Sequence, residues 1–242
     1  MEILKFTLRG KTGFFKKPEV NTYYYFTYGN IHRVALLGIF GAILGYGGHA
    51  QRDKEAAFPE FYEKLKDMKM SIVPKAPKGY IQKKIQTFNN SVGYASKEQG
   101  GNLIVKEQWL ENPEWDIFVM LEGETSKNLA RAIEKAHYVY LPYLGKNDHP
   151  ADIRNILIIE DGSVVKTPNY IDSLVPGEWV KLDIDDEEYE VKNPFKYEEY
   201  LPFTLNSDTN LYELKSFVYS NMKVVQANCE VVYADQKHLV FY

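Results

Sequence analysis

Within the first 45 residues, the spacing of apolar residues changes from the period of a strand to that of a helix. Leu4, Phe6 and Leu8 alternate with polar residues, and this period of two predicts a half-buried strand. From Arg33 to Leu44 the apolar residues recur at helical spacing instead. A strand and a helix must each bury an apolar face against another element, so this start favours a domain of packed α and β layers.

Further elements follow in an order that is typical of one supersecondary unit. A short helix is expected after Pro59, and then a long, basic, extended segment over residues 79–106 that two adjacent glycines interrupt. A strand is expected over residues 115–121 and a helix over residues 126–137. The series of strand, helix, extended insertion, strand, helix and strand matches a ferredoxin-like βαββαβ unit, which is an α+β fold.

The last third of the chain is rich in predicted strands. Asp161-Gly162, within RNILIIEDGSVVK, predicts a two-residue hairpin, and residues 222–242 predict a second one. The acidic run DIDDEEYE before position 191 is interpreted as a solvated turn rather than a cation site. Cys229 is the only cysteine, so this sequence can form no internal disulfide and no cysteine-based zinc site. We expect Cys229 to be buried in a strand and inert.

The predicted helix carries a stripe of small residues at helical spacing, namely Gly38, Gly41, Ala42 and Gly45. Each glycine lowers helix propensity by about 1 kcal/mol relative to alanine, so the stripe needs an offsetting interaction. Close approach of a neighbouring backbone would supply it. The helix is predicted to end in the glycine-rich loop GYGG at residues 45–48, where a glycine C-cap is expected.

Charge is distributed very unevenly along the chain. The formal net charge is -4, which taken alone argues against a nucleic-acid partner. Residues 1–106 contain 17 lysines and arginines against 8 acidic residues, a net of +9, whereas residues 107–242 contain 12 against 25, a net of -13. An asymmetry of this size indicates that one face of the molecule meets a polyanion.

Basic residues interleave with aromatic ones in two segments of the cationic part. The first holds Lys11, Phe14, Phe15, Lys16 and Lys17, and the start of the following helix adds His32 and Arg33. Lysine and arginine neutralise phosphates, and aromatic faces stack on unpaired bases, so RNA contact is expected here. The alternative is that the two phenylalanines fill the core. The extended basic segment with Lys83 and Lys84 is expected either to touch RNA or to be ordinary solvated surface.

Several apparent motifs carry no function. Gly10-Lys11-Thr12 lacks the preceding glycine and the following helix of a phosphate-binding loop, and the GxGxxA pattern from Gly45 follows a helix where the dinucleotide fingerprint follows a strand. The five histidines lack metal-site spacing, so no metal is expected. His49, beside Tyr46, is interpreted as a surface or phosphate-contacting residue, or alternatively as an acid or base in RNA cleavage.

No membrane segment is expected either. The longest apolar stretch, residues 34–48, is too short to cross a bilayer, and the N-terminal ten residues lack the apolar core of a signal peptide. A cytoplasmic location is therefore expected.

Three stretches together resemble the Cas-five family of CRISPR-associated proteins, members of the RAMP superfamily. They are the N-terminal LKFTLRGKTGFFKKPEVNTYYYFTYGNIHRVALLGIFGAILGYGG, then VKEQWLENPEWDIFV, and then YLPYLGKNDHPADI. Each is weak alone, but their order and spacing are those of the family, and the last is most similar to the type I-B branch.

The resemblance implies a subunit of a Cascade surveillance complex for antiviral DNA targeting. Such a subunit binds the 5′ handle of the CRISPR RNA, caps the Cas-seven backbone and abuts a large Cas-eight-type subunit, and the complex reaches target DNA through the guide RNA. The family fold is a ferredoxin-like (RRM-like) palm with a protruding β-hairpin thumb. That predicts an RNA-binding domain over residues 1–150, with residues 79–106 as the thumb, and a β-rich region over residues 151–242 packed on it.

Residues and resemblance together give one set of expected RNA contacts: Arg9, Lys11, Phe14, Phe15, Lys16, Lys17, His32, Arg33, Gly45, Gly47, Gly48, Lys83, Lys84 and Lys146. The glycines enter this set because bare backbone lets phosphates approach.

Catalysis is not expected, and neither is a cofactor. In type I-B-like systems a separate Cas-six nuclease cuts the precursor RNA, whereas the type I-C branch of the family cleaves it with tyrosine, lysine and histidine and without metal. The first alternative is therefore a metal-independent endoribonuclease that uses Tyr46 and His49. A second alternative is a stand-alone module that binds a small ligand in a tyrosine-rich pocket.

Overall fold

A four-stranded antiparallel sheet lies at the centre of the molecule. The computed structural model describes residues 1–19, 24–184 and 193–242. The sheet has the order β3-β6-β1-β7, and its strands are β3 (Met70–Pro74), β6 (Glu114–Met120), β1 (Ile3–Arg9) and β7 (Asp152–Ile159). The predicted strands at residues 4–8 and 115–121 are thereby confirmed.

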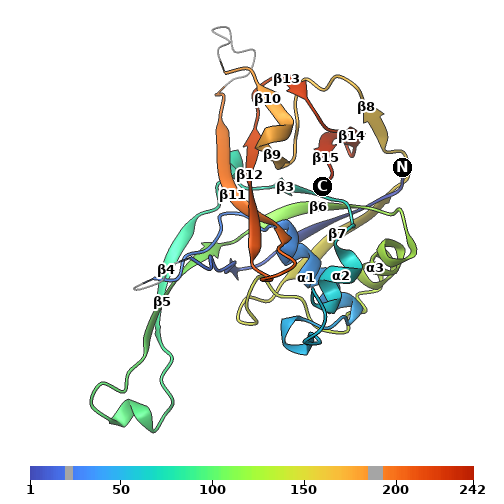
Figure 1. Ribbon diagram of the computed structural model, residues 1–242. Helices are drawn as coiled ribbons and strands as arrows, with labels where there is room; N and C mark the ends of the chain where they lie inside the picture. The colour runs from blue at the N-terminus through green and yellow to red at the C-terminus, as the bar shows by residue number, and fades with distance from the viewer. Residues whose placement is uncertain (20–23, 185–192) are drawn as a thin grey trace.

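Three α-helices connect these strands. Helices α1 (Arg33–Leu44) and α2 (Glu60–Leu65) lie between β1 and β3 in the chain, and α3 (Glu124–Glu134) lies between β6 and β7. All three were expected from the sequence, although α3 ends three residues earlier than predicted. The helices gather beside the central sheet, below it in the view of Figure 1.

The strand β1 is buried on both faces, although alternation predicted a half-buried strand. Leu4, Phe6 and Leu8 join the main core with the helices. Ile3 belongs to a second cluster, which includes Phe118 and strands from the C-terminal region. The sequence could not show this second cover because it comes from residues more than 200 positions away.

The helix α1 has the ends that its sequence predicts. The Ala35 amide, in its first turn, donates to His32 Nδ1 at 3.2 Å, and Gly45 ends the helix in the left-handed conformation with φ of 81°. Gly41 explains part of the glycine stripe, because a Cβ there would lie 2.4 Å from the Cβ of Phe61 on α2. Close packing of α2 therefore offsets the propensity cost at this position.

A long hairpin extends away from the body, at the lower left of Figure 1. It consists of β4 (Lys83–Asn89) and β5 (Ile104–Glu111), with a 3-10 turn η3 (Ala95–Lys97) at its far end. Lys83 lies opposite Leu110, and Asn89 lies opposite Ile104. The predicted hairpin is thus confirmed, although it starts and ends about five residues later than residues 79–106. The short strand β2 (Thr12–Gly13) pairs with the base of β5.

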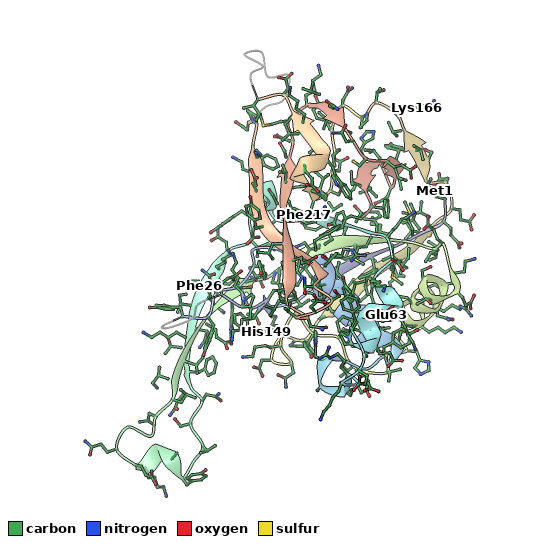
Figure 2. All side chains as sticks on the ribbon, viewed as in Figure 1. Met1, Phe26, Glu63, His149, Lys166 and Phe217 are labelled. Carbon is green, nitrogen blue, oxygen red and sulfur yellow. The ribbon has the colours of Figure 1, made fainter. Side chains whose placement is uncertain are left out.

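The C-terminal region forms three small antiparallel sheets, β11-β12-β9, β15-β14-β8 and β10-β13. The strands are β8 (Ser163–Val165), β9 (Val175–Pro176), β10 (Val180–Leu182), β11 (Lys196–Leu205), β12 (Tyr212–Ser220), β13 (Val224–Ala227), β14 (Val231–Ala234) and β15 (Lys237–Val240). Short 3-10 turns follow α1 (η1, His49–Gln51), precede β4 (η2, Pro77–Gly79) and precede β10 (η4, Gly177–Trp179). Phe217 of β12 packs against Tyr242 at 5.0 Å, inside this part of the molecule (Figure 2).

Three predictions for this region need correction. Asp161-Gly162 does not close a hairpin, because β7 pairs with β1 while β8 pairs with β14 of another sheet. The second predicted hairpin is confirmed only for β14 and β15, since β13 pairs with β10. Cys229 lies between β13 and β14, half-buried, and not in a strand. The acidic run DIDDEEYE lies mostly outside the described residues.

Among the helices that the structure describes, none is long and apolar enough to cross a membrane.

Candidate nucleic-acid interface

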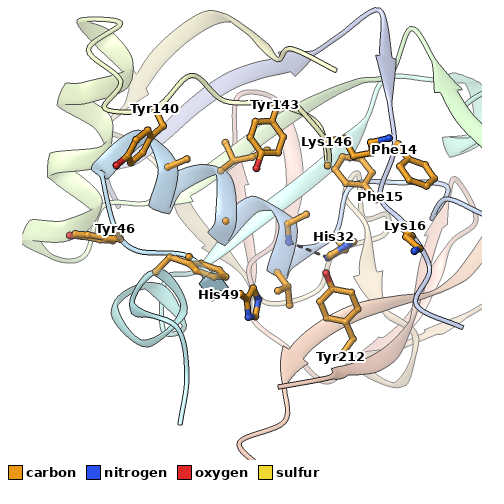
Figure 3. Close-up of a pocket in the computed structure, with 18 of the residues that line it drawn as sticks. Phe14, Phe15, Lys16, His32, Tyr46, His49, Tyr140, Tyr143, Lys146 and Tyr212 are labelled. Atoms are coloured by element: carbon orange, nitrogen blue, oxygen red, sulfur yellow. Dashed lines mark hydrogen bonds between the residues drawn. The ribbon is translucent and has the colours of Figure 1, made fainter. Parts of the chain in front are cut away.

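A groove of about 880 Å³ runs along the open side of α1 (Figure 3). Ala35, Gly38 and Ala42 line it at intervals of three and four residues, so they form one stripe of the helix. No large side chain rises from this stripe. The small residues that were predicted to permit close packing therefore serve two purposes: Gly41 admits α2, and its neighbours leave the groove open.

The walls of the groove are aromatic and come from segments far apart in the sequence. They include His49 and Phe61 near the end of α1, Tyr140 and Tyr143 from the segment between α3 and β7, and Tyr212 from β12. Tyr140 and Tyr143 are 62% and 44% exposed. Exposed rings beside a groove can stack on unpaired bases.

Tyr140 and Tyr143 were not among the residues expected to bind RNA. Their segment is held against the helix end, because the Val139 amide donates to the Ile43 carbonyl and the Tyr140 amide to the Ala42 carbonyl, both at 3.1 Å. The first bond satisfies a carbonyl at the helix end, and the second adds a donor to the Ala42 carbonyl, which also accepts from the Gly45 amide at 3.3 Å. The run VYLPY at residues 139–143 has no charged residue. This signal does not show that the run is exposed beside the end of α1, because that placement depends on tertiary contacts.

One end of the groove holds an ion pair between a half-buried lysine and a buried carboxylate. Lys146 Nζ donates to Glu107 Oε1 at 3.0 Å and to Oε2 at 3.1 Å, and Trp109 Nε1 donates to Oε2 at 2.8 Å. Glu107, on β5, is 5% exposed. The ammonium also lies 5.6 Å from the ring centres of Phe14 and Phe88, so it connects the body to the hairpin. Its charge is balanced inside the protein, which leaves it a weak candidate for phosphate.

His32 and Arg33 lie in the interior, which corrects their prediction as phosphate contacts. His32 is buried, and burial lowers its pKa to about 3, so the ring is neutral at physiological pH. Arg33 donates from Nη1 to the Phe203 carbonyl at 3.3 Å and from Nη2 to the Lys66 carbonyl. Burial also lowers the Arg33 pKa. The guanidinium thus holds two chain segments together instead of facing solvent.

Phe14 and Phe15 also belong to the interior, at 2% and 3% exposed. Phe15 packs edge-on against Trp115 at 6.0 Å and against His32 at 5.9 Å, and its amide donates to the Thr27 hydroxyl at 2.9 Å. Both residues border the groove, but almost none of their surface reaches solvent. This burial argues against stacking on a base and favours the core-filling alternative.

The cations of the N-terminal part differ in how they are neutralised. Arg9 pairs with Asp152 at 3.1 Å, Lys17 with Glu199 at 3.5 Å and Lys84 with Glu111 at 3.4 Å. Lys83 is half-buried, and this burial lowers its pKa.

Lys11 and Lys16, the other two lysines of the predicted basic loop, are exposed. Lys11 lies at the turn between β1 and β2. Lys16 lines the groove, with its ammonium 4.2 Å from the centre of the Tyr25 ring. Of the predicted basic contacts, Lys16 is therefore the exposed cation that the groove places beside an aromatic ring.

The glycine loop after α1 forms the other end of the groove (Figure 3). Tyr46 is half-buried, and His49 is exposed and packs edge-on against Phe61 at 5.7 Å. Burial and, next, the charge of Arg52 lower the His49 pKa. The amides of Gly47 and Gly48 are not bare as predicted, because each donates to a side-chain oxygen.

His149 lies apart from the groove at the base of the hairpin. It is fully buried, its Nδ1 lies 2.7 Å from the Thr12 hydroxyl, and its ring meets Trp109 edge-on at 4.6 Å. Across the described ranges, no group of three or more histidine, cysteine, aspartate and glutamate side chains is arranged to hold a metal ion.

No protein-family model and no curated protein sequence matches this chain. A solved structure described as a "CRISPR RNA-guided surveillance complex" matches it with a TM-score of 0.53 and 13% identity, over 93% of this chain and 91% of that one. A CRISPR protein from Archaeoglobus fulgidus gives a TM-score of 0.49 and 11% identity over 99% of both chains. The first match shows that the chain shares that fold, a mixed α and β arrangement with much sheet and few helices.

Proposed function

We propose that this protein is a non-catalytic subunit of a CRISPR surveillance complex of the type I-B kind, and that it binds the 5′ handle of the CRISPR RNA in the groove along α1. The carrying observation is the groove itself, with its floor of small residues, exposed tyrosines and Lys16. It occurs in a chain that shares the fold of a protein from a CRISPR RNA-guided complex.

The chemistry of the groove suits single-stranded RNA. Unpaired bases gain about 1–3 kcal/mol each from stacking on an aromatic side chain, and Tyr140 and Tyr143 offer such rings. The small floor of α1 lets a sugar-phosphate backbone lie close to the helix. Readout of target DNA would belong to the guide RNA, while the protein holds the shape of the handle.

The arrangement of elements supports a palm and thumb. The order β3-β6-β1-β7, all antiparallel and connected through α1 and α3, is the order expected of a ferredoxin-like βαββαβ palm. The hairpin β4–β5 would be the thumb. The division into domains at residue 150 and the cytoplasmic location stay predictions.

The end of the hairpin fits contact with a protein neighbour better than contact with RNA. Residues 88–105 contain one lysine and one glutamate and so carry no net charge. Val92, Tyr94, Leu103 and Ile104 are each more than half exposed there. Exposed apolar residues of this kind mark protein interaction sites. The Cas-seven backbone and the large Cas-eight-type subunit are the expected neighbours.

Filter binding tests the proposed function. A short single-stranded RNA with the handle sequence should bind, and its affinity should fall steeply as salt is raised, because phosphate neutralisation releases counterions. A weak signal that does not change with salt would instead favour the small-ligand module. Co-purification of the chain with CRISPR RNA and the backbone subunit would then test the assembly.

The ribonuclease remains the alternative function, because Tyr46 and His49 lie at the same end of the groove. A lowered pKa keeps the His49 imidazole neutral, as a general base requires. Incubation of the isolated protein with cognate precursor RNA should leave it intact on a denaturing gel. Cleavage that Tyr46→Phe or His49→Ala abolishes would overturn the non-catalytic proposal.

A further inference from the structure

Two consecutive backbone amides at the end of the groove are occupied by side chains of the protein itself. The Gly47 amide donates to Glu60 Oε2 at 2.7 Å, and the Gly48 amide donates to Gln51 Oε1 at 3.0 Å. Gly47 and Gly48 both line the groove. Backbone amides are common donors to bound anions.

A lysine completes the surroundings of the Glu60 carboxylate. Lys64 Nζ lies 2.6 Å from Glu60 Oε1 and 4.3 Å from the centre of the Tyr46 ring. One carboxylate oxygen therefore accepts from a backbone amide and the other from an ammonium group. The two non-bridging oxygens of a phosphodiester would use the same kinds of donor.

The loop is held in place so that these donors keep their positions. The Phe61 amide donates to the Gly47 carbonyl at 3.1 Å, so α2 is bonded to both the amide and the carbonyl of Gly47. A Cβ at Gly47 would lie 3.3 Å from Glu60 Oε2, which would press on the carboxylate. A larger residue at position 47 would therefore crowd this contact.

The carboxylate itself is free to leave. Its side chain is 47% exposed, so rotation into water requires no rearrangement of the core. Lys64 and, next, the Gly47 amide lower the Glu60 pKa, which keeps the group ionised at neutral pH.

We propose that the amides of Gly47 and Gly48, with Lys64, form a phosphodiester subsite of the groove, and that the Glu60 carboxylate, with the Gln51 side chain at the Gly48 amide, fills this subsite until an RNA phosphate displaces both. This inference rests on the proposed function, because RNA is the polyanion that the groove would bind. A small anion must displace Glu60 by itself, whereas an RNA strand is already held by the rest of the groove. Glu60 therefore discriminates against small anions.

The test is Glu60→Gln, which keeps the shape of the side chain and removes its charge. Affinity for single-stranded RNA should rise about two- to fivefold, the range of one exposed charge pair. The slope of log affinity against log salt should steepen by about 0.7, because without the Glu60 charge Lys64 becomes one more uncompensated cation for the single strand. Adding Lys64→Gln to Glu60→Gln should reverse both gains.

Glu63→Gln is the matched control. Glu63 lies in the same first turn of α2, at the surface, and pairs with Lys66 instead of a backbone amide (Figure 2). If Glu63→Gln raises the affinity as much as Glu60→Gln does, the effect is general charge and the subsite is overturned. An unchanged affinity in Glu60→Gln would overturn it as well, while RNA binding by the unaltered chain would leave the proposed function intact.

Titration with inorganic pyrophosphate separates the two proposals. Amide NMR signals of Gly47 and Gly48 should shift on addition of pyrophosphate to Glu60→Gln and stay in place in the unaltered protein. If these shifts occur but no variant binds RNA, the subsite holds and the RNA-binding proposal fails. If Glu60→Gln changes neither the affinity for RNA nor the response of the Gly47 and Gly48 signals to pyrophosphate, the subsite is overturned.

Discussion

The two ends of α1 are both predicted from the sequence to contact RNA, but they differ in the structure. The start of the helix follows a basic, aromatic loop, and its end leads into a glycine-rich loop with a tyrosine and a histidine. The sequence predicts contacts to RNA in both loops. The groove passes both ends, but the structure buries His32 and Phe15 at the start, whereas it leaves His49 exposed at the end. Composition alone therefore does not distinguish a binding loop from a core segment.

The cause of the difference lies far away in the sequence. The start of α1 is covered by β11 and β12, where the Phe203 carbonyl accepts from Arg33 and the ring of Tyr212 lies 5.4 Å from that of His32. At the other end, Gly45 terminates the helix, and the segment around Val139 covers only one side of the helix end. The start of α1, called the covered end below, therefore contributes to the stability of the fold. The end of α1, called the open end, is available for a ligand.

Removal of a buried ring at the covered end should have the largest effect. Phe15→Ala leaves a cavity beside Trp115, so the free energy of unfolding should fall by about 3–5 kcal/mol. Urea unfolding followed by tryptophan fluorescence measures this. Phe15→Leu should recover most of the loss and bind RNA as the unaltered chain does. If Phe15→Ala leaves stability unchanged and weakens RNA binding, the ring stacks on a base and the comparison fails.

Removal of an exposed ring at the open end should weaken RNA binding and leave stability unchanged. Tyr143→Ala should weaken binding of single-stranded RNA by about 1–3 kcal/mol, the contribution of one stacked base, with little change in stability. Tyr143→Phe should keep the affinity. Tyr200→Ala is the control, because Tyr200 is 64% exposed on β11 and does not line the groove. Equal effects of the two alanine variants would exclude stacking at Tyr143.

These two ends also show how far sequence reasoning reaches. Period and capping residues locate β1, α1 and β6 to within a residue or two, because these properties depend on neighbours in the chain. The hairpin at Asp161-Gly162 is wrong because turn chemistry does not determine which sheet a following strand joins. Lys16 was found as a groove cation, but Tyr143 was missed, since its place beside α1 depends on tertiary contacts between distant segments.

A pH series tests whether His32 serves as a buried helix cap. Its pKa in the folded protein is about 3, below the value of about 6.5 in an unfolded chain. Between these values only the unfolded chain binds the proton, so stability should fall as the pH is lowered, by up to about 1.4 kcal/mol per pH unit. His32→Asn keeps a capping oxygen and removes the titration. Urea unfolding between about pH 7 and pH 5 should show a flatter dependence in the variant. An equal slope in both proteins would mean that His32 is not buried in its neutral form.

The smallest expected effect compares two neighbouring lysines of the basic loop. Lys16 is exposed beside the groove, so Lys16→Gln should weaken RNA binding about two- to fivefold and reduce the salt slope by about 0.7. Lys17→Gln should change the affinity less, because Glu199 already neutralises Lys17 at 3.5 Å. Filter binding at two salt concentrations measures both. Equal losses would show that the whole loop meets RNA through its charge. A loss in Lys16→Gln alone would mean that only the residue facing the groove takes part, and that the covered end of α1 reaches the ligand through this one side chain.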